Sequence, residues 1–314
     1  MSTNPRVSSA IPGEPAHFAS VLAHQPVLAS RFGEVYGTFW TSDVLSARVK
    51  ELCRMRNARI TQCGFCRQVR FDKPLRDGLD ETAIADVTDD YAQSSVLSTA
   101  EKAALRFTDA LIHDPALLDR EARDELHQHF TPPQIAELGI GIALFLALAK
   151  VLITLGLEPD AMGTTVLPTP RIGGGGAPPP PRQAHEDTPL DRALAHNPDL
   201  AERFRAFHDA PRADALLDPA IHELVNRRIA QIHESASEPA NADDPRAKAV
   251  LPFVDKLPFA HHAISDDEAG AAREALGDAG FVALAVHAAL CDAQYRLRLV
   301  MERVLAPADA APAG

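Results

Sequence analysis

Apolar residues recur at helical spacing through most of the chain, and no segment shows the apolar/polar alternation of a half-buried strand. Residues 44–59 have this spacing and contain neither glycine nor proline. The sequence Ser-Thr-Ala-Glu at 98–101 is a capping box, which predicts a helix that continues to about residue 113. Another helix is predicted over 119–130. The fold class is therefore predicted to be all-α, with strands playing no large part.

A long helix is predicted from Pro132 to about Leu157, with Thr131 as its N-cap and proline at its first position. From Ile140 onward this segment is apolar on nearly every side. A helix of this kind has no face suited to water, so we expect it to be buried in the domain or in a subunit interface. A matching cap, Asp244-Pro245, stands in the second half of the chain.

Residues 168–190 are rich in glycine and proline and predict a linker, because no packed element tolerates that composition. The linker separates residues 15–167 from residues 191–305. Residues 1–14 and 306–314 are expected to be loose ends. The organisation predicted is two helical domains of similar size.

The two halves share sequence at two constant offsets in residue number. The segment LAHQP at 22–26 recurs as LAHNP at 194–198, which is an offset of 172. Leu105, Phe107, Asp109 and Leu111 recur as Leu251, Phe253, Asp255 and Leu257, at an offset of 146. Matches at fixed offsets indicate a tandem duplication. At the first offset Cys63 and Cys66 fall on Ser235 and Glu238, so residues 191–305 are interpreted as a degenerate copy without a cysteine pair.

The composition narrows the classes of partner. Hydrophobic residues make up 46% of the 314 residues, enough for a sizeable core. The formal net charge of −12 argues against a general nucleic-acid binder or a protein of anionic membranes. We found no apolar run of transmembrane length and no signal-like stretch at the N-terminus, so a cytoplasmic location is predicted.

Four cysteines in a chain of this size do not form a disulfide framework. Cys53 and Cys291 stand alone and are expected to be small buried apolar residues. Cys63 and Cys66 form the single CxxC, and Thr61 is predicted to cap the helix that holds it. A thiol in the first turn of a helix is stabilised as thiolate by the positive helix end, and the second cysteine follows one turn along the same face. The spacing therefore predicts a dithiol redox pair.

Other uses of a CxxC fit the sequence less well. A structural zinc site needs four ligands, and neither a second CxxC nor a close histidine pair is evident. A thioredoxin-like site needs a βαβ setting, which the pattern does not contain. We therefore predict no metal and no cofactor.

Basic residues gather around the CxxC. Between residues 44 and 71 the only acid is Glu51, and the bases are Arg48, Lys50, Arg54, Arg56, Arg59, Arg67 and Arg70. Such a field lowers a thiol pKa and attracts anions. The alternative is a solvated basic face, or ion pairs with the acidic remainder of the chain.

Three short motifs in this region carry a resemblance to a known family. They are Glu51-Leu52, Arg56-Asn57-Ala58-Arg59 and Cys63-Gly64-Phe65-Cys66. Together they resemble the signature of the carboxymuconolactone decarboxylase superfamily, in particular its AhpD-like alkylhydroperoxidase branch. The resemblance covers about residues 15–160, with 190–305 as the degenerate copy. It implies an all-α fold, assembly into homo-oligomers (here a dimer or trimer of two-domain chains), and peroxide reduction by thiols without metal or haem.

The resemblance also implies roles for individual residues. Cys66 would be the peroxidatic thiol, Cys63 its resolving partner, and Glu51 a member of the proton relay. Decarboxylase activity is not expected, because members with that activity generally lack the CxxC.

One position departs from the family pattern. Arg70 stands where the family usually has histidine, and arginine does not act as a general base at neutral pH. Arg70, like Arg59, is instead a candidate for stabilising a thiolate or binding an anionic substrate. The histidine step is then missing or supplied from elsewhere, and the candidates left open are His24, His113, His127 and His129.

Three functional hypotheses follow. The first is a thiol peroxidase that reduces hydroperoxides through a Cys63/Cys66 dithiol/disulfide cycle and is reset by a dithiol donor or reductase protein. The second is a dithiol redox sensor or reductase with little peroxidase turnover. The third is a non-enzymatic oligomeric scaffold or small-ligand binder.

Overall fold

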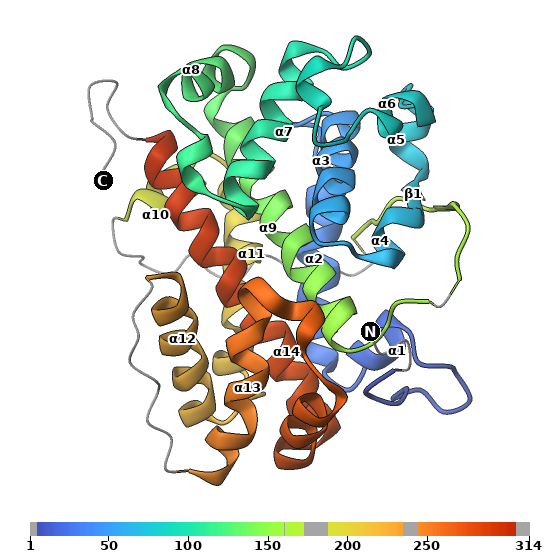
Figure 1. Ribbon diagram of the computed structural model, residues 1–314, viewed down its shortest axis with the longest axis vertical. Coiled ribbons are helices and arrows are strands. Elements are labelled where there is room, and N and C mark those ends of the chain that lie inside the picture. Colours follow the sequence, from blue (N-terminus) through green and yellow to red (C-terminus); the bar gives the residue numbers. More distant parts are fainter. Residues whose placement is uncertain (1–4, 160, 173–187, 235–243, 306–314) are drawn as a thin grey trace.

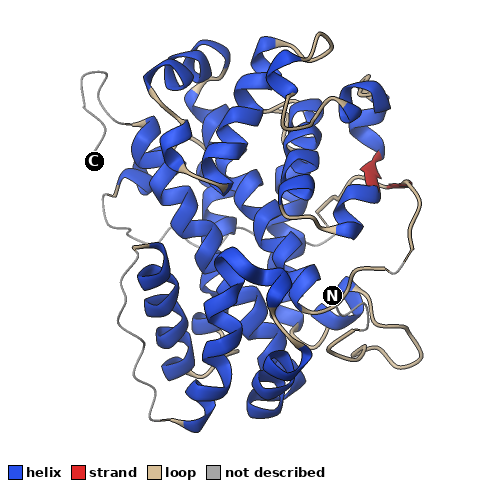
Figure 2. Cartoon of the chain, in the orientation of Figure 1, coloured by secondary structure: helices blue, strands red, loops and turns tan. Residues whose placement is uncertain are grey.

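A computed structural model describes residues 5–159, 161–172, 188–234 and 244–305. Within them 72% of the residues are helical and only 2% lie in strands, which confirms the all-α fold class (Figure 2). The elements of the first half are α1 (Phe18–Leu22), α2 (Pro26–Thr41), α3 (Ala47–Ile60), α4 (Gly64–Gln68), β1 (Val69–Phe71), α5 (Asp72–Arg76), α6 (Glu81–Ala85), η1 (Tyr91–Gln93), α7 (Thr99–Ile112), η2 (Pro115–Leu117), α8 (Arg120–His129), α9 (Pro132–Thr154) and β2 (Thr165–Leu167). Those of the second half are α10 (Pro189–Leu194), α11 (Pro198–Ala213), α12 (Pro219–His233), α13 (Pro245–Ala260), η3 (His261–Ala263) and α14 (Asp266–Val304).

The helix ends follow local capping chemistry. Ser98 and Glu101 form the predicted capping box at the start of α7, and Thr131 and Gln134 form another at the start of α9. Helix α9 ends at Thr154, slightly before the predicted Leu157, in a Schellman motif. There Gly156 has φ 66° and the N–H of Leu157 reaches the carbonyl of Leu152.

The sequence pattern did not reveal two short strands. β1 and β2 pair in parallel, with Val69 opposite Thr165 and Phe71 opposite Leu167. Each has three residues, which is too short for a period of two to be recognised.

Helix α9 is the central element of the core. It packs against α14, α3 and α7 and also touches α2, α10 and α11 (Figure 1). By length and composition alone α9 and α14 qualify as candidate membrane spans, which corrects our sequence-based statement that no apolar run reaches transmembrane length. In α9, however, 94% of the most apolar window is buried inside the protein, as expected of a core helix.

Buried charges fix how α9 and α14 pack together. The Lys150 Nζ atom lies 2.5 Å from the Asp292 carboxylate, which also accepts hydrogen bonds from Arg296 at 2.9 Å and His233 at 2.8 Å. Burial by itself raises the pKa of Asp292, but Lys150 and Arg296 outweigh it and hold the pKa well below its ordinary value. Asp292 is therefore a charged carboxylate inside the core.

The helix boundaries of the two halves follow the two sequence offsets. Helices α2 and α11 both have 16 residues, and their starts at Pro26 and Pro198 are related by the offset of 172. The starts of α7 and α13 are related by the offset of 146, as are those of η2 and η3. Within α14, Gly277 has φ 70° and interrupts the helix at the position that the second offset assigns to Thr131, the N-cap of α9. These helix boundaries agree with the predicted tandem duplication.

Two of our expectations about irregular segments need correction. Arg6 donates hydrogen bonds to the carbonyls of Thr154 and Ile264, and Val7 is fully buried, so these two residues are packed, whereas residues 11–15 are exposed as expected. In the predicted linker 168–190, Thr169 is buried and bonded to Asp72, and α10 already begins at Pro189. Residues 173–187, 1–4 and 306–314 lie outside the described residues.

We predict that Asp292→Ala destabilises the protein by about 3–5 kcal/mol, because Lys150 and Arg296 keep buried charges without their carboxylate. Urea denaturation checks this against Asp124→Ala, which removes the exposed partner of Arg120 and should change stability by no more than about 1 kcal/mol. Because the pKa of Asp292 is depressed in the folded protein, the free energy of unfolding depends on pH. The Asp292 contribution is complete above the unfolded pKa of about 4 and is lost as the pH falls toward the folded pKa. Equal urea midpoints for the two variants would contradict the assignment.

Candidate active site

The CxxC lies in a sharp turn between α3 and α4. Thr61 is the C-cap of α3, and Gln62 has φ 54°, which reverses the chain direction. Cys63 is itself the N-cap of α4, and its sulfur lies 3.2 Å from the backbone nitrogen of Cys66. This corrects the prediction that Thr61 caps the helix and that Cys63 lies within its first turn. The two sulfurs form a disulfide.

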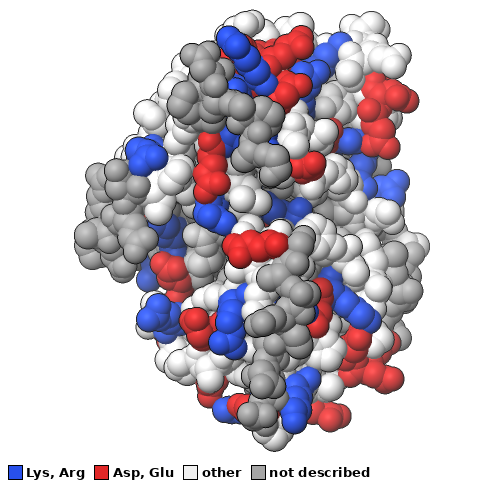
Figure 3. Space-filling model, turned by 60° about the vertical axis from the view of Figure 1, so that its left-hand side comes forward, with Lys and Arg blue, Asp and Glu red and all other residues white. Residues whose placement is uncertain are grey.

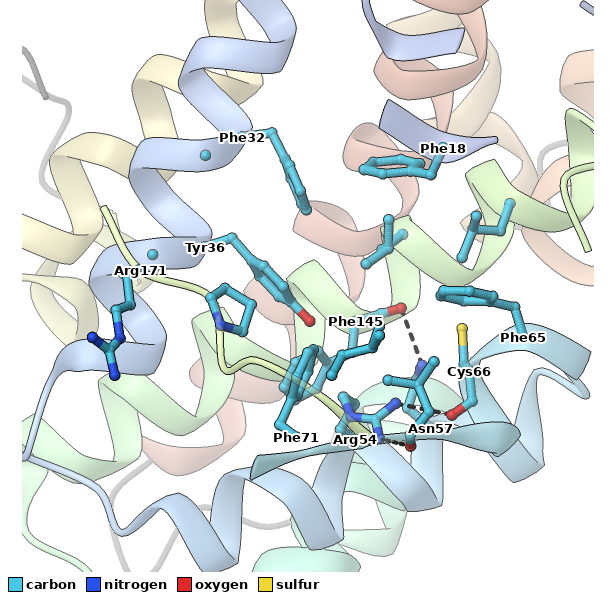
Figure 4. Close-up of a pocket in the computed structure, with 17 residues that line it drawn as sticks. Phe18, Phe32, Tyr36, Arg54, Asn57, Phe65, Cys66, Phe71, Phe145 and Arg171 are labelled. Carbon is cyan, nitrogen blue, oxygen red and sulfur yellow. Dashed lines mark hydrogen bonds between the residues drawn. The ribbon is translucent and has the colours of Figure 1, made fainter. Parts of the chain in front are cut away.

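The two cysteines differ in their exposure and in whether they line a cavity. Cys63 is fully buried, whereas Cys66 is 8% exposed and lines a cavity of about 270 Å³. Figure 4 shows the Cys66 sulfur next to the ring of Phe65 at the edge of this cavity. A molecule in the cavity would therefore meet Cys66 before Cys63.

The cavity is mostly apolar and aromatic. Its rings are Phe18, Phe32, Tyr36, Phe65, Phe71 and Phe145, which come from α1, α2, α4, β1 and α9 (Figure 4). Burial raises the pKa of Tyr36 to about 12, so its phenol is neutral at physiological pH. Pro170 and Arg171, from the segment predicted to be linker, close one side. Such a lining suits a ligand with an apolar body.

Arg54 connects the cysteine turn to α3. It lines the cavity, and its Nη1 donates to the carbonyl of Cys66 at 2.9 Å. Its Nε and Nη2 hold the Glu51 carboxylate at 2.8 and 2.6 Å, and Nη2 also donates to the carbonyl of Val69. Glu51 is fully buried and accepts a further hydrogen bond from the N–H of Phe71. Glu51 and Cys66 are thus connected by hydrogen bonds through Arg54, which binds the Glu51 carboxylate on one side and the Cys66 carbonyl on the other.

The two other predicted site residues are hydrogen-bonded to other groups. Arg70 binds both carboxylate oxygens of Glu81, at 2.8 and 3.1 Å. Arg59 donates to backbone carbonyls in and just after α6, including that of Ile84 at 2.7 Å. Within the described residues neither guanidinium donates to a cysteine sulfur.

Most of the basic cluster is neutralised by acids that are distant in sequence. Arg48 pairs with Glu101 at 2.5 Å, Lys50 with Glu137 at 2.7 Å, and Arg56 with Asp109 at 2.7 Å. On the face of the molecule that Figure 3 shows, Lys and Arg side chains also lie interspersed with Asp and Glu side chains. The ion-pair alternative therefore describes these residues better than an open positive field.

The histidines named from the sequence do not contact the CxxC in the described structure. His24, for example, bonds to the carbonyl of Ser8, and His127 to that of Val304. Two other histidines, from the second half of the chain, do reach the turn that holds the CxxC. His262 Nε2 lies 2.7 Å from the carbonyl oxygen of Thr61, and His261 Nε2 lies 3.5 Å from it. Burial lowers the pKa of His261 to about 4, so its imidazole is neutral.

The structure also places beside the CxxC a carboxylate that was not predicted from the sequence. Glu158, in the loop after α9, accepts a hydrogen bond from the N–H of Gly64, which lies inside the CxxC. Only its position after the predicted long helix was visible in the sequence, and nothing local signalled that the loop returns to the cysteines.

Comparison with known proteins adds little about function. No family model matches the chain. An uncharacterized protein found in two strains of Mycobacterium tuberculosis is 33% identical to it over 108 residues. The match covers 34% of this chain and 37% of the relative, so the chain spans well under half the length of the curated relatives it matches.

Glu51→Gln is expected to destabilise the protein by about 3–5 kcal/mol, because the Arg54 charge stays buried without its counter-ion. Glu125→Gln is the matched control. It breaks the pair with Arg106, in which both side chains are well exposed, at 42% and 31%, and should cost no more than about 1 kcal/mol. Urea denaturation measures both. If Glu51→Gln unfolds like the parent, Glu51 is not held in place for stability.

Proposed function

We propose that the protein is a thiol-dependent oxidoreductase that reduces hydroperoxides through a Cys63/Cys66 dithiol/disulfide cycle. The observation that carries the proposal is the pairing of the two cysteines at the edge of an apolar cavity, with Cys66 facing the cavity and Cys63 buried behind it. The resemblance of the three sequence motifs to the AhpD-like branch supports the same assignment of roles.

The cavity favours an organic hydroperoxide over hydrogen peroxide. Its aromatic lining gains free energy from an apolar body, at roughly 25 cal/mol per Å² removed from water. Hydrogen peroxide has no apolar surface to bury. Arg54 and Asn57 are polar members of the lining and offer donors to the peroxide oxygens.

In the proposed cycle the Cys66 thiolate attacks the distal peroxide oxygen. The O–O bond breaks, Cys66 becomes a sulfenic acid, and the alkoxide leaves as the alcohol after taking a proton. The Cys63 thiol then attacks the Cys66 sulfur, which forms the disulfide and releases water. A dithiol donor or reductase protein supplies two electrons and two protons by exchange.

A carboxylate is needed to accept the Cys63 proton. Glu51 was the candidate from the sequence and is ion-paired with Arg54, which makes it a positioning residue as well. Glu158 is a second candidate, because it hydrogen-bonds the backbone within the CxxC. In this proposal the chain works as a homo-oligomer in the cytoplasm, with no metal or other cofactor, and without nucleic-acid or membrane partners.

A redox sensor or reductase is the second candidate function. Among the described residues, no histidine or carboxylate hydrogen-bonds to the sulfur of Cys63 or Cys66, and Arg70 occupies the relay position. Slow peroxide chemistry with an intact disulfide couple would fit that arrangement.

Stopped-flow consumption of cumene hydroperoxide by the reduced protein tests the leading proposal. We expect a larger kcat/KM for this substrate than for hydrogen peroxide, and a loss of about 10³-fold or more in Cys66→Ser and in Cys63→Ser under turnover. Cys53→Ser is the matched control, because Cys53 is buried and does not line the cavity, so it should not meet the substrate. Activity that survives in both CxxC variants would refute the proposal.

A glutathione redox titration tests the second candidate. The sensor function predicts a reversible two-electron transition of the Cys63–Cys66 pair, followed by mass after alkylation, while peroxide turnover stays at the rate of the free reductant. A pair that cannot be reduced in the folded protein would rule out both candidates.

A further inference from the structure

The second half of the chain contains a cavity of its own. It has a volume of about 240 Å³, and its lining includes Cys291 of α14, His208 of α11 and Asn226 of α12. Gln294, Tyr295 and Arg298 add further polar groups. None of its lining residues lines the cavity beside Cys66, so it is a separate space.

This second cavity matches the first in position. Most of the residues that line it are related, by one or other of the two sequence offsets, to residues that line the first. Cys291 corresponds to Phe145, His208 to Tyr36, and Asn226 to Arg54. The second half thus keeps the location of the cavity, while a thiol, an imidazole and an amide replace aromatic rings and a guanidinium.

In this second cavity the side chains of Cys291 and His208 have the geometry of a nucleophile and its base. The Cys291 sulfur lies 4.0 Å from Nε2 of His208, within reach of a sulfur hydrogen bond. His208 Nδ1 lies 2.8 Å from the Asp209 carboxylate, which accepts a hydrogen bond and so places the ring proton on Nδ1. The lone pair of Nε2 therefore faces the thiol. In the described structure the thiol donates to Asn226 Oδ1 at 3.0 Å, and a rotation of the S–H about the Cβ–Sγ bond turns it toward His208 Nε2 without moving the sulfur.

We propose that this cavity is a second reactive site, independent of the CxxC, in which Cys291 is the nucleophile and His208 its general base, and that it takes a small activated acyl ester or thioester. Acyl transfer needs a nucleophile and a base that face the same cavity, with a carboxylate that orients the base, and Cys291, His208 and Asp209 have this arrangement. The side-chain amide of Gln294 offers a donor to a developing oxyanion.

The proposed reaction balances without an added oxidant or reductant. His208 Nε2 takes the proton of the Cys291 thiol as the sulfur bonds to the acyl carbon. The bond to the leaving group then breaks, and the alcohol or thiol departs with the proton from His208. Water, deprotonated by the same imidazole, releases the carboxylic acid and restores the thiol.

The surroundings explain why a base is required. Burial, with the charges of Asp292 and Asp209, raises the Cys291 pKa far above its ordinary value, so the thiol stays protonated at neutral pH. His287, 3.5 Å from the sulfur, has its pKa lowered by burial and is also neutral. No cation is among the groups that shift the thiol pKa, so the thiol depends on proton transfer for its reactivity.

The test uses the full chain with its CxxC oxidised, so that its outcome is independent of the peroxidase proposal. Incubation with p-nitrophenyl acetate, followed by peptide mass mapping, should place one acetyl group on Cys291. Cys291→Ala should abolish the label, and His208→Gln should slow acetylation by about 100-fold. Cys53→Ala is the matched control and should leave the rate unchanged, because Cys53 is buried and lines neither cavity.

Iodoacetamide labelling gives a second readout that does not require acyl chemistry. Cys291 should be alkylated in the folded, oxidised protein, and Cys53 should not. The proposal is overturned if Cys291 is no more reactive than Cys53 toward both reagents, or if His208→Gln acetylates at the parental rate. Far-UV circular dichroism and thermal melts establish that each variant is folded.

Discussion

Helix α9 has no side that tolerates water, and the arrangement of the other helices follows from covering it. From Ile140 to its end its residues are apolar apart from Lys150 and Thr154, and its most apolar window is almost entirely buried. Helices α3 and α7 of the first half cover part of its surface, and α14 of the second half covers much of the rest. The second half is therefore a structural requirement of the first, whatever chemistry it performs.

The packing of the other helices on α9 determines the shape of the candidate site. Phe145 of α9 forms part of the cavity, and its carbonyl accepts a hydrogen bond from Asn57 of α3 at 3.0 Å. The cysteine turn begins where α3 ends, so its place relative to the cavity is set by how α3 lies on α9. A buried ion pair then fixes the turn itself, through the Arg54 guanidinium that joins Glu51 to the Cys66 carbonyl.

The features that could be predicted from the sequence are those that depend on residues close to one another along the chain. The capping box at Ser98, the N-cap Thr131 with its following proline, and the helical apolar period predicted the helices, because these effects act within one or two turns. Contacts across the chain were not predictable in this way. The acids that neutralise Arg48 and Lys50 come from α7 and α9, far along the sequence, so the bases resembled an open positive field. Cys291 seemed isolated because its partners, His208 and Asn226, come from α11 and α12.

The hydrogen bond from His262 to the carbonyl of Thr61 joins the two halves at the residue that ends α3, just before the CxxC. If the turn shifts when the disulfide opens, this contact has a different free energy in the two oxidation states. Thermodynamic reciprocity then requires that whatever loosens the second half also changes the reduction potential of the cysteine pair, by an equal coupling free energy. The second half would in that case act as a tuning element for a redox couple that it does not itself contain.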